Sequence, residues 1–214
     1  MSYDRLGMAK LYFGGTFNPI HNAHLQCSTA AAAAGGFDEV VLVPTGQSAL
    51  RNIADLAPAN DRLAMTRIAA EEWTGPIRVS VELIEVQRPG TSYTIDTVLA
   101  LKAAGVEQVH WLIGTDQLLN LHRWHRYHEL LGVVQFWVMA RPGYVIDWNA
   151  IDPAARRLWD HVLRGPLVDI SSTMIRQQLH RGYAVDQWVS PGVAAYIREH
   201  SLYSPTPAGT DAAD

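Results

Sequence analysis

Runs of apolar residues bounded by glycine or proline alternate along the chain with longer segments of helical character. The run at 39–43 (EVVLV) is apolar after its first residue, which is typical of a strand buried on both faces of a parallel sheet. The same signals predict strands at 10–13, 39–43, 77–81, 109–113, 135–140 and 167–170. Helices are expected at 23–34, 60–73, 95–104, 127–131, 151–163, 171–180 and 191–200. This alternation predicts an α/β fold: a doubly wound, Rossmann-like, mostly parallel sheet with helices on both faces.

Local signals indicate where several elements begin and end. Gly35-Gly36 should end the first helix, and 83–88 should continue the chain along the sheet edge until Pro89-Gly90. The polar loop at 45–59 is long for a connection between strand and helix, which favours a substrate loop. Side chains that can cap a helix precede three predicted helices: Asn60 or Asp61, Thr91 or Ser92, and Ser171 or Ser172.

Length and composition limit the partners. The chain has 214 residues, so we expect one domain at 1–203 followed by a disordered tail at 204–214, which is rich in Pro, Gly, Ala, Thr and Asp. A net charge of −4 provides no basic surface for nucleic acid. No apolar run could span a membrane and no signal peptide is evident, so a cytoplasmic protein without a membrane partner is expected. The single Cys27 excludes an intrachain disulfide. The sequence does not fix the oligomeric state, and a homo-oligomer is compatible with it.

The strongest chemical signal lies at the end of the first predicted strand, in the segment GGTFNPIHNAH. Gly14 and Gly15 allow the backbone to approach a ligand, and the helix that follows offers unpaired N–H groups to a phosphate. His21 and His24 are three residues apart, so on a helix both rings would face the same charged group. The structural alternative is a helix cap and a core histidine. The whole segment, in this context, favours a nucleotide-phosphate site.

A second signal is the segment ISSTMIR at 170–176. Ser171, Ser172 and Thr173 at a helix N-terminus offer hydroxyls and backbone donors, and Arg176 can grip a phosphate through its fork. Taken alone, this pattern favours ordinary helix capping over a phosphate site. Together with the first segment, it predicts phosphate donors from both ends of the chain around one cleft.

These two segments resemble the nucleotidyltransferase superfamily that carries an HxGH-type motif and, within it, the bacterial nicotinate-mononucleotide adenylyltransferases. The resemblance implies that backbone N–H groups of the turn bind ATP phosphates and that three side chains stabilise charge on the α-phosphate without a covalent intermediate. The residues concerned are Gly14, Gly15, Thr16 and Phe17 for the turn, and His21, His24 and Arg176 for catalysis; Ser171, Ser172 and Thr173 would add to the ATP site. The family pattern often has aspartate at Asn18 and glycine at Ala23.

Further segments resemble the nicotinate branch of this superfamily. They are SYTIDT at 92–97, GTD at 114–116 and the surroundings of Trp124. By resemblance Gly114 and Asp116 would bind ATP, while the second nucleotide would contact Thr45, Arg51, Thr94, Trp124 and His125. Trp124 offers a face for a pyridine ring, although an ordinary buried tryptophan is the alternative. The histidines at 122, 125 and 128 lack a carboxylate or cysteine companion, so exposed loop residues are expected instead of a metal site.

The resemblance implies an enzyme that joins ATP to nicotinate mononucleotide, giving the dinucleotide and pyrophosphate in NAD biosynthesis. Mg²⁺ would accompany the nucleotide, held by phosphates and water, and no dedicated protein metal site is expected. The alternatives within the fold are a preference for nicotinamide mononucleotide and a pantetheine-phosphate adenylyltransferase. From another class, a noncatalytic nucleotide sensor would fit the segment Ser48-Ala49-Leu50-Arg51, where the family usually has Pro-Pro-His-Lys.

Overall fold

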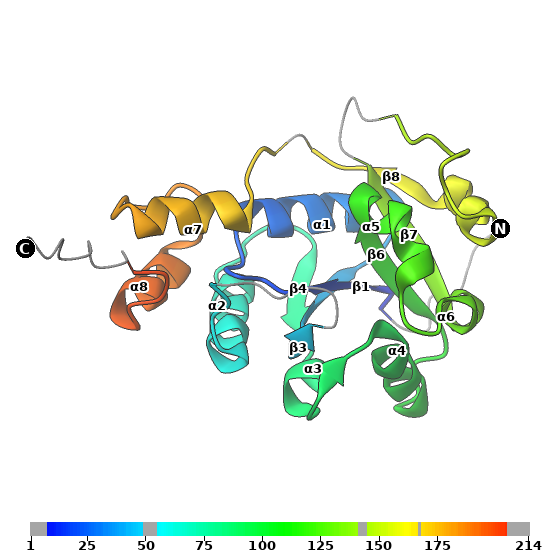
Figure 1. The fold of residues 1–214 in the computed structure, drawn as a ribbon, viewed down its shortest axis with the longest axis horizontal. Helices are drawn as coiled ribbons and strands as arrows, with labels where there is room; N and C mark the ends of the chain where they lie inside the picture. The colour runs from blue at the N-terminus through cyan, green and yellow to red at the C-terminus, as the bar shows by residue number, and fades with distance from the viewer. Residues whose placement is uncertain (1–7, 49–54, 141–144, 167, 205–214) are drawn as a thin grey trace, which may run out of the picture.

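The computed structural model describes residues 8–48, 55–140, 145–166 and 168–204. Its centre is a six-stranded parallel sheet in the order β4-β2-β1-β6-β7-β8 (Figure 1). The strands are β1 (Lys10–Gly15), β2 (Glu39–Pro44), β4 (Arg78–Val81), β6 (Val109–Gly114), β7 (Val134–Ala140) and β8 (Val162–Arg164). Two further short strands, β3 (Gln47–Ser48) and β5 (Thr91–Ser92), pair in parallel beside it. The predicted doubly wound α/β fold is confirmed.

Helices cover both faces of this sheet (Figure 1). Side chains of one face pack with α1 (Asn22–Gly35), α2 (Ala59–Glu71), α7 (Ser172–His180) and α8 (Pro191–Glu199). The other face packs with α4 (Thr94–Ala103), α6 (Tyr127–Val133) and the 3₁₀ helix η2 (Pro153–His161). The short helices α3 (Ile84–Gln87), α5 (Thr115–Leu119) and η1 (Leu121–Arg123) lie in the connections. No helix within the described ranges is long and apolar enough to cross a membrane.

The central strands are buried on both sides, as their apolar runs predict. Every residue of β2 is buried, and successive residues of β1 join opposite apolar clusters: Leu11 and Phe13 one, Tyr12 the other. Because β1 is paired to β2 on one side and to β6 on the other, the chain reverses its winding direction beside β1. In sheets of this type, that reversal opens a crevice at the carboxyl ends of the strands.

Two predicted elements differ from the structure near the sheet edges. Segment 83–88 does not continue the sheet but forms the single turn α3, where the buried Glu85 accepts a hydrogen bond from Thr97 Oγ1 at 2.8 Å. The predicted helix at 151–163 is 3₁₀ over Pro153–His161. Its buried residues Ala155 and Leu158 are three apart, a spacing that fits both helix types, so periodicity could not separate them.

The edge strand and two helix caps are also corrected. The strand expected at 167–170 lies earlier, at β8, because Val162 pairs with Val138 of β7, while residues 168–170 form neither strand nor helix. The N-caps of α2 and α4 are Pro58 and Tyr93, and neither makes a side-chain cap bond. The predicted cap at Ser171 and the glycine end of α1, with Gly36 at φ 72°, are confirmed. Of the predicted tail at 204–214, only Ser204 is among the described residues.

Candidate active site

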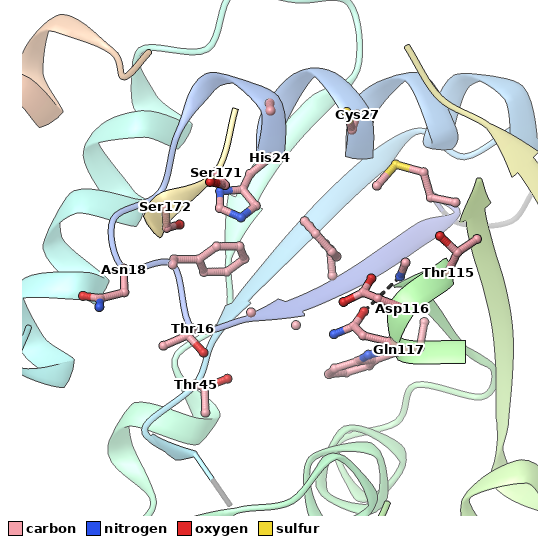
Figure 2. Close-up of a pocket in the computed structure, with 18 of the residues that line it drawn as sticks. Thr16, Asn18, His24, Cys27, Thr45, Thr115, Asp116, Gln117, Ser171 and Ser172 are labelled. Atoms are coloured by element: carbon pink, nitrogen blue, oxygen red, sulfur yellow. Dashed lines mark hydrogen bonds between the residues drawn. The ribbon is translucent and has the colours of Figure 1, made fainter. Parts of the chain in front are cut away.

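A cavity of about 1000 Å³ opens at the carboxyl ends of β1 and β6, where the sheet reverses its winding. Figure 2 shows His24, Ser171 and Ser172 on one side of this cavity and Asp116 and Gln117 on the other. Sixteen predicted site residues line it: Gly14, Gly15, Thr16, Phe17, His21, His24, Thr45, Thr94, Gly114, Asp116, Trp124, His125, Ser171, Ser172, Thr173 and Arg176. Arg51 lies outside the described residues. The fold therefore gathers segments from both ends of the chain around one cavity.

The two glycines that end β1 are needed for packing. A Cβ on Gly14 would lie 2.5 Å from Cζ2 of Trp111, and a Cβ on Gly15 would lie 2.7 Å from the ring of Phe17. Phe17 itself is buried and adopts φ 47°, which folds its ring back under the turn. We expected these glycines to leave space for a ligand; in the structure, the space that a Cβ would fill is occupied by the rings of Trp111 and Phe17. The backbone of the turn still lines the cavity.

His21 and His24 stack face to face. Their ring centroids are 3.6 Å apart with an interplanar angle of 22°. They do not both lie on the helix as expected, because His21 is the N-cap of α1 with extended backbone (φ −149°) and His24 is the third residue of that helix. The backbone N–H of His21 donates to Nδ1 of His24 at 3.2 Å. Nδ1 of His24 is thus an acceptor, so its neutral ring carries the proton on Nε2.

Both imidazoles are neutral near pH 7. Burial lowers the pKa of His21 to about 4. Burial and the neighbouring His21 lower the pKa of His24 well below 6.5. We expected the two rings to neutralise phosphate charge; with pKa values lowered by burial, they would face a phosphate as uncharged hydrogen-bonding groups. Arg176 lines the same cavity and could balance that charge.

The N-terminus of α7 is joined directly to the turn after β1. Ser171 Oγ accepts a hydrogen bond from the Met174 N–H at 3.2 Å, which is the ordinary cap considered above. Ser172 Oγ donates to the carbonyl of Pro19 at 2.9 Å. Arg176 Nη1 donates to the carbonyl of Asn18 at 2.8 Å. Arg176 Nη2 donates to Thr173 Oγ1 at 3.5 Å, so two nitrogens of the guanidinium are used within the protein, while the side chain still lines the cavity.

The opposite part of the cavity is aromatic. The rings of Tyr93 and His125 lie 4.3 Å apart, and Trp124 is half-buried with its ring edge-on to Phe136 at 6.1 Å. Burial raises the pKa of Glu85, which also lines the cavity, although the hydrogen bond from Thr97 acts in the opposite direction. This region offers ring faces and hydroxyl groups, in contrast to the backbone amides and imidazoles beside β1.

No group of three or more His, Cys, Asp or Glu side chains within the described residues is arranged to hold a metal ion. The exposed histidines at 122, 125 and 128 accordingly form no such cluster.

Comparison with known proteins identifies the family. The model of the cytidylyltransferase-like family matches residues 12–178. A probable nicotinate-nucleotide adenylyltransferase of Herpetosiphon aurantiacus is 40% identical over 193 residues, covering 89% of this chain and 96% of that protein. One from Pectobacterium atrosepticum is 38% identical, covering 90% and 97%. The chain belongs to the cytidylyltransferase-like family.

Solved structures agree with the fold of this cytidylyltransferase-like protein. The Plasmodium falciparum nicotinic acid mononucleotide adenylyltransferase complexed with NaAD superposes with a TM-score of 0.69 at 17% identity, covering 92% of this chain and 98% of that one. A putative nicotinate-nucleotide adenylyltransferase from Vibrio parahaemolyticus gives 0.61 at 18% identity, covering 93% and 98%. At these identities the likeness concerns the fold.

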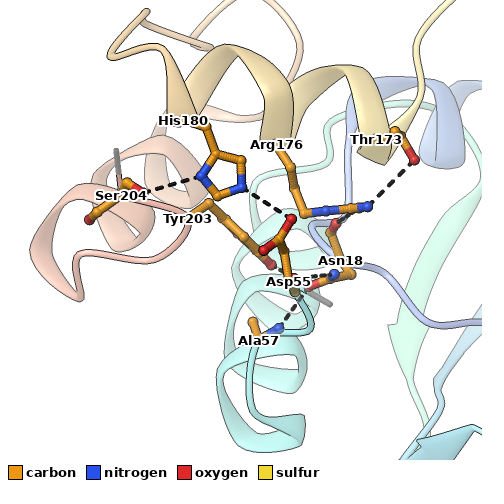
Figure 3. Close-up of polar contacts among 8 residues, drawn as sticks. All are labelled: Asn18, Asp55, Ala57, Thr173, Arg176, His180, Tyr203 and Ser204. Atoms are coloured by element: carbon orange, nitrogen blue, oxygen red, sulfur yellow. Dashed lines mark hydrogen bonds and ion pairs between the residues drawn. The ribbon is translucent and has the colours of Figure 1, made fainter. Parts of the chain in front are cut away.

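Asn18, in the family motif of this cytidylyltransferase-like chain, connects the turn to distant segments. Its buried side chain donates to the carbonyl of Asp55 at 2.8 Å and accepts from the Ala57 N–H at 3.0 Å and the Tyr203 hydroxyl at 2.6 Å (Figure 3). His180 lies beside this network, with Nε2 3.2 Å from Asp55 Oδ2. Sequence reasoning gave Tyr203 no site role, because nothing in its local sequence indicates a partner 185 residues away.

Replacing Tyr203 with phenylalanine should lower the free energy of unfolding by about 1 kcal/mol, because Asn18 loses one of its buried hydrogen bonds. The exposed Tyr183 provides a control, and Tyr183→Phe should change the stability little. Urea denaturation followed by tryptophan fluorescence and circular dichroism measures both. Coincident transitions are expected if residues 1–203 form one domain. Equal stability of the two variants would contradict the role of Tyr203.

Stability should fall as the pH decreases from about 6.5 toward 4. The folded-state pKa of His21 lies near 4, below its unfolded value of 6.5, so the unfolded chain takes up the proton first. At pH 4.5 the loss attributable to His21 is about 2–3 kcal/mol. His21→Asn, which retains a good N-cap residue, should lose correspondingly less than the wild type between pH 7 and 4.5. Urea denaturation at both pH values, with the exposed His128→Ala as control, measures the difference. An equal loss in wild type and His21→Asn would show that His21 is not buried as a neutral ring.

Proposed function

We propose that this protein transfers the adenylyl group of ATP to nicotinate mononucleotide, giving nicotinate adenine dinucleotide and pyrophosphate in NAD biosynthesis. The observation that carries the proposal is one cavity that places the turn after β1 and its stacked neutral histidines opposite the aromatic group Tyr93, Trp124 and His125. One part suits a triphosphate and the other a pyridine ring. The names of the relatives that match nearly the whole chain support the same reaction.

The reaction needs no covalent enzyme intermediate. A 5′-phosphate oxygen of the mononucleotide attacks the α-phosphorus of ATP in line, the bond from the α-phosphorus to the bridging oxygen of the β-phosphate breaks, and pyrophosphate leaves with that electron pair. The Nε2–H of His24 would donate to a non-bridging oxygen of the α-phosphate as charge develops there. The guanidinium of Arg176, which lines the cavity, would supply positive charge to the same phosphates. Catalysis would then consist of positioning and electrostatic stabilisation.

Mg²⁺ would arrive with ATP, bound by phosphate oxygens and water, and when bound it would neutralise charge on the departing pyrophosphate. The donor set of the cavity fits this arrangement, because the side chains beside the turn after β1 are imidazoles, hydroxyls and an arginine. These residues would hold the phosphates, and the cation would be held by the phosphates in turn.

Discrimination between pyridine rings would come from hydrogen-bond donors. Stacking on Trp124 does not separate nicotinate from nicotinamide, because the rings are alike. A carboxylate presents two acceptor oxygens to the hydroxyl of Thr94 and to nearby backbone N–H groups, whereas the amide presents its own NH₂ to the same donors. The nicotinate form is therefore the expected substrate.

Pyrophosphate release on mixing ATP, Mg²⁺ and nicotinate mononucleotide tests the reaction. Wild-type protein should turn over, and His24→Ala should lower kcat by about 10²-fold with little change in KM, because the lost donor acts mainly in the transition state. His21→Ala should act in the same direction, since it removes the ring that stacks on His24, although the backbone N–H that donates to His24 Nδ1 is kept. His128→Ala is the matched control: it is exposed and does not line the cavity. ATP binding without turnover would indicate a nucleotide sensor, and near-normal kcat in both histidine variants would contradict their role.

Nicotinate mononucleotide should be preferred over its amide by roughly ten- to several-hundred-fold in kcat/KM, since one or two unpaired buried donors cost about 1–3 kcal/mol each. Trp124→Ala should weaken both substrates alike. Steady-state kinetics with each mononucleotide at fixed ATP measures the ratio. Equal use of the two by the wild type would show that the Thr94 and Trp124 region does not read the carboxylate.

A further inference from the structure

Arg62 is a buried cation bound entirely to backbone. Its side chain extends from α2 and the residue is only 1% exposed. The guanidinium donates to four carbonyl groups: Nε to Ala57 at 3.0 Å, Nη1 to Thr16 at 2.7 Å and to Thr45 at 2.6 Å, and Nη2 to Gly46 at 2.8 Å. Burying a charge is costly, and an apolar side chain could fill the same space without that cost. The arginine is therefore explained by the backbone that it holds.

The carbonyl groups that Arg62 binds belong to two loops that line the cavity, the turn after β1 and the loop after β2. Thr16 lies in the turn after β1, beside the histidine pair, whereas Thr45 and Gly46 follow β2. The two loops meet again where the Thr45 N–H donates to the carbonyl of Gly15 at 2.9 Å. A single planar side chain thus fixes the spacing of two loops that leave adjacent strands.

The hydrogen bond from Arg62 to the Thr16 carbonyl also sets the direction of the Phe17 N–H. In a trans peptide the carbonyl of one residue and the N–H of the next point in opposite directions. The Thr16–Phe17 bond is trans, so holding the Thr16 carbonyl toward Arg62 turns the Phe17 N–H away from it. This N–H donates to no group within the described part of the chain, and Phe17 lines the cavity. It is available to a phosphate oxygen.

The contact at Gly46 extends the effect toward the pyridine side. A Cβ on Gly46 would lie 2.3 Å from the carbonyl oxygen of Glu85 and 3.2 Å from Ser92 Oγ. The Gly46 backbone therefore packs directly on α3 and on β5, just before Tyr93 and Thr94. A shift of this loop would be transmitted to the residues that face the mononucleotide.

We propose that Arg62 is a positioning residue for the adenylyl transfer, which holds the turn at Thr16 and the loop at Thr45–Gly46 in one arrangement through their carbonyl groups. The expected effect of Arg62 on catalysis rests on the proposed function. The expected effect of Arg62 on the arrangement of the two loops does not. Because Arg62 acts only through the backbone of both loops, its replacement should lower kcat/KM for both substrates.

The test compares Arg62→Met with Met65→Ala. Met65 is fully buried on the same helix, and its truncation destabilises the core without removing any of the four hydrogen bonds to the loop carbonyls. At a temperature well below both melting transitions, Arg62→Met should lower kcat/KM for ATP and for the mononucleotide by about 10- to 100-fold, because misplacement of about 1 Å costs that much. Amide hydrogen exchange should rise at 14–18 and 45–47. Met65→Ala should show neither change.

Arg62→Lys distinguishes the effect of side-chain geometry from the effect of charge. It also provides the test if Arg62→Met does not fold. Lysine keeps the cation but cannot reach four carbonyls as a rigid fork, so its loop exchange and kcat/KM should also depart from the wild type. Wild-type behaviour of Arg62→Lys, or unchanged loop exchange in Arg62→Met, would overturn the proposal. If the wild type fails to release pyrophosphate, the proposed function fails, and the exchange comparison still decides whether Arg62 holds the loops.

Discussion

The turn after β1 is held through its carbonyl groups by side chains from two helices, α2 and α7. Arg62 donates a hydrogen bond to the carbonyl of Thr16 at 2.7 Å. Arg176 donates to that of Asn18 at 2.8 Å, and Ser172 donates to that of Pro19 at 2.9 Å. Each of these donors comes from a helix far along the chain. With its carbonyl groups occupied on the protein side, the turn presents N–H groups and two imidazoles to the cavity. The rest of the structure, from the sheet reversal to the C-terminal tyrosine, serves to keep this backbone in place.

Burial of the histidine pair decides what kind of chemistry this backbone can support. Stacked rings at 3.6 Å could not both be protonated without strong repulsion, and burial lowers the pKa of each. In the proposed reaction the site would therefore separate two tasks: neutral groups would donate hydrogen bonds to a phosphate as charge develops there, and cationic groups would balance its net charge. Arg176, which lines the cavity, and a cation bound to the nucleotide would take the second task. The protein can then bind a highly charged substrate without titrating its own histidines near neutral pH.

Most of the fold and much of the site follow from the sequence because their signals are local. Apolar runs such as 39–43 become buried strands, and the motif residues around His21 and Arg176 line the cavity because both segments follow strand ends or helix caps. Other features depend on contacts between distant residues. The bonds from Arg62 to Thr16 and from Tyr203 to Asn18 span 46 and 185 residues, and no local pattern indicates them. The turn at 83–88 was misassigned for the same reason, since the buried Glu85 finds its partner on α4.

Asn18 illustrates how a departure from a family pattern can be fitted to its surroundings. An amide offers a donor and an acceptor, and its neighbours require both: the Asp55 carbonyl accepts, while the Ala57 N–H and the Tyr203 hydroxyl donate. An aspartate, which the resemblance would lead one to expect at this position, would set a carboxylate oxygen against the Asp55 carbonyl, acceptor against acceptor, in a buried place. The asparagine is therefore coupled to the path of the chain at Asp55, which explains how this turn keeps its arrangement without the charge.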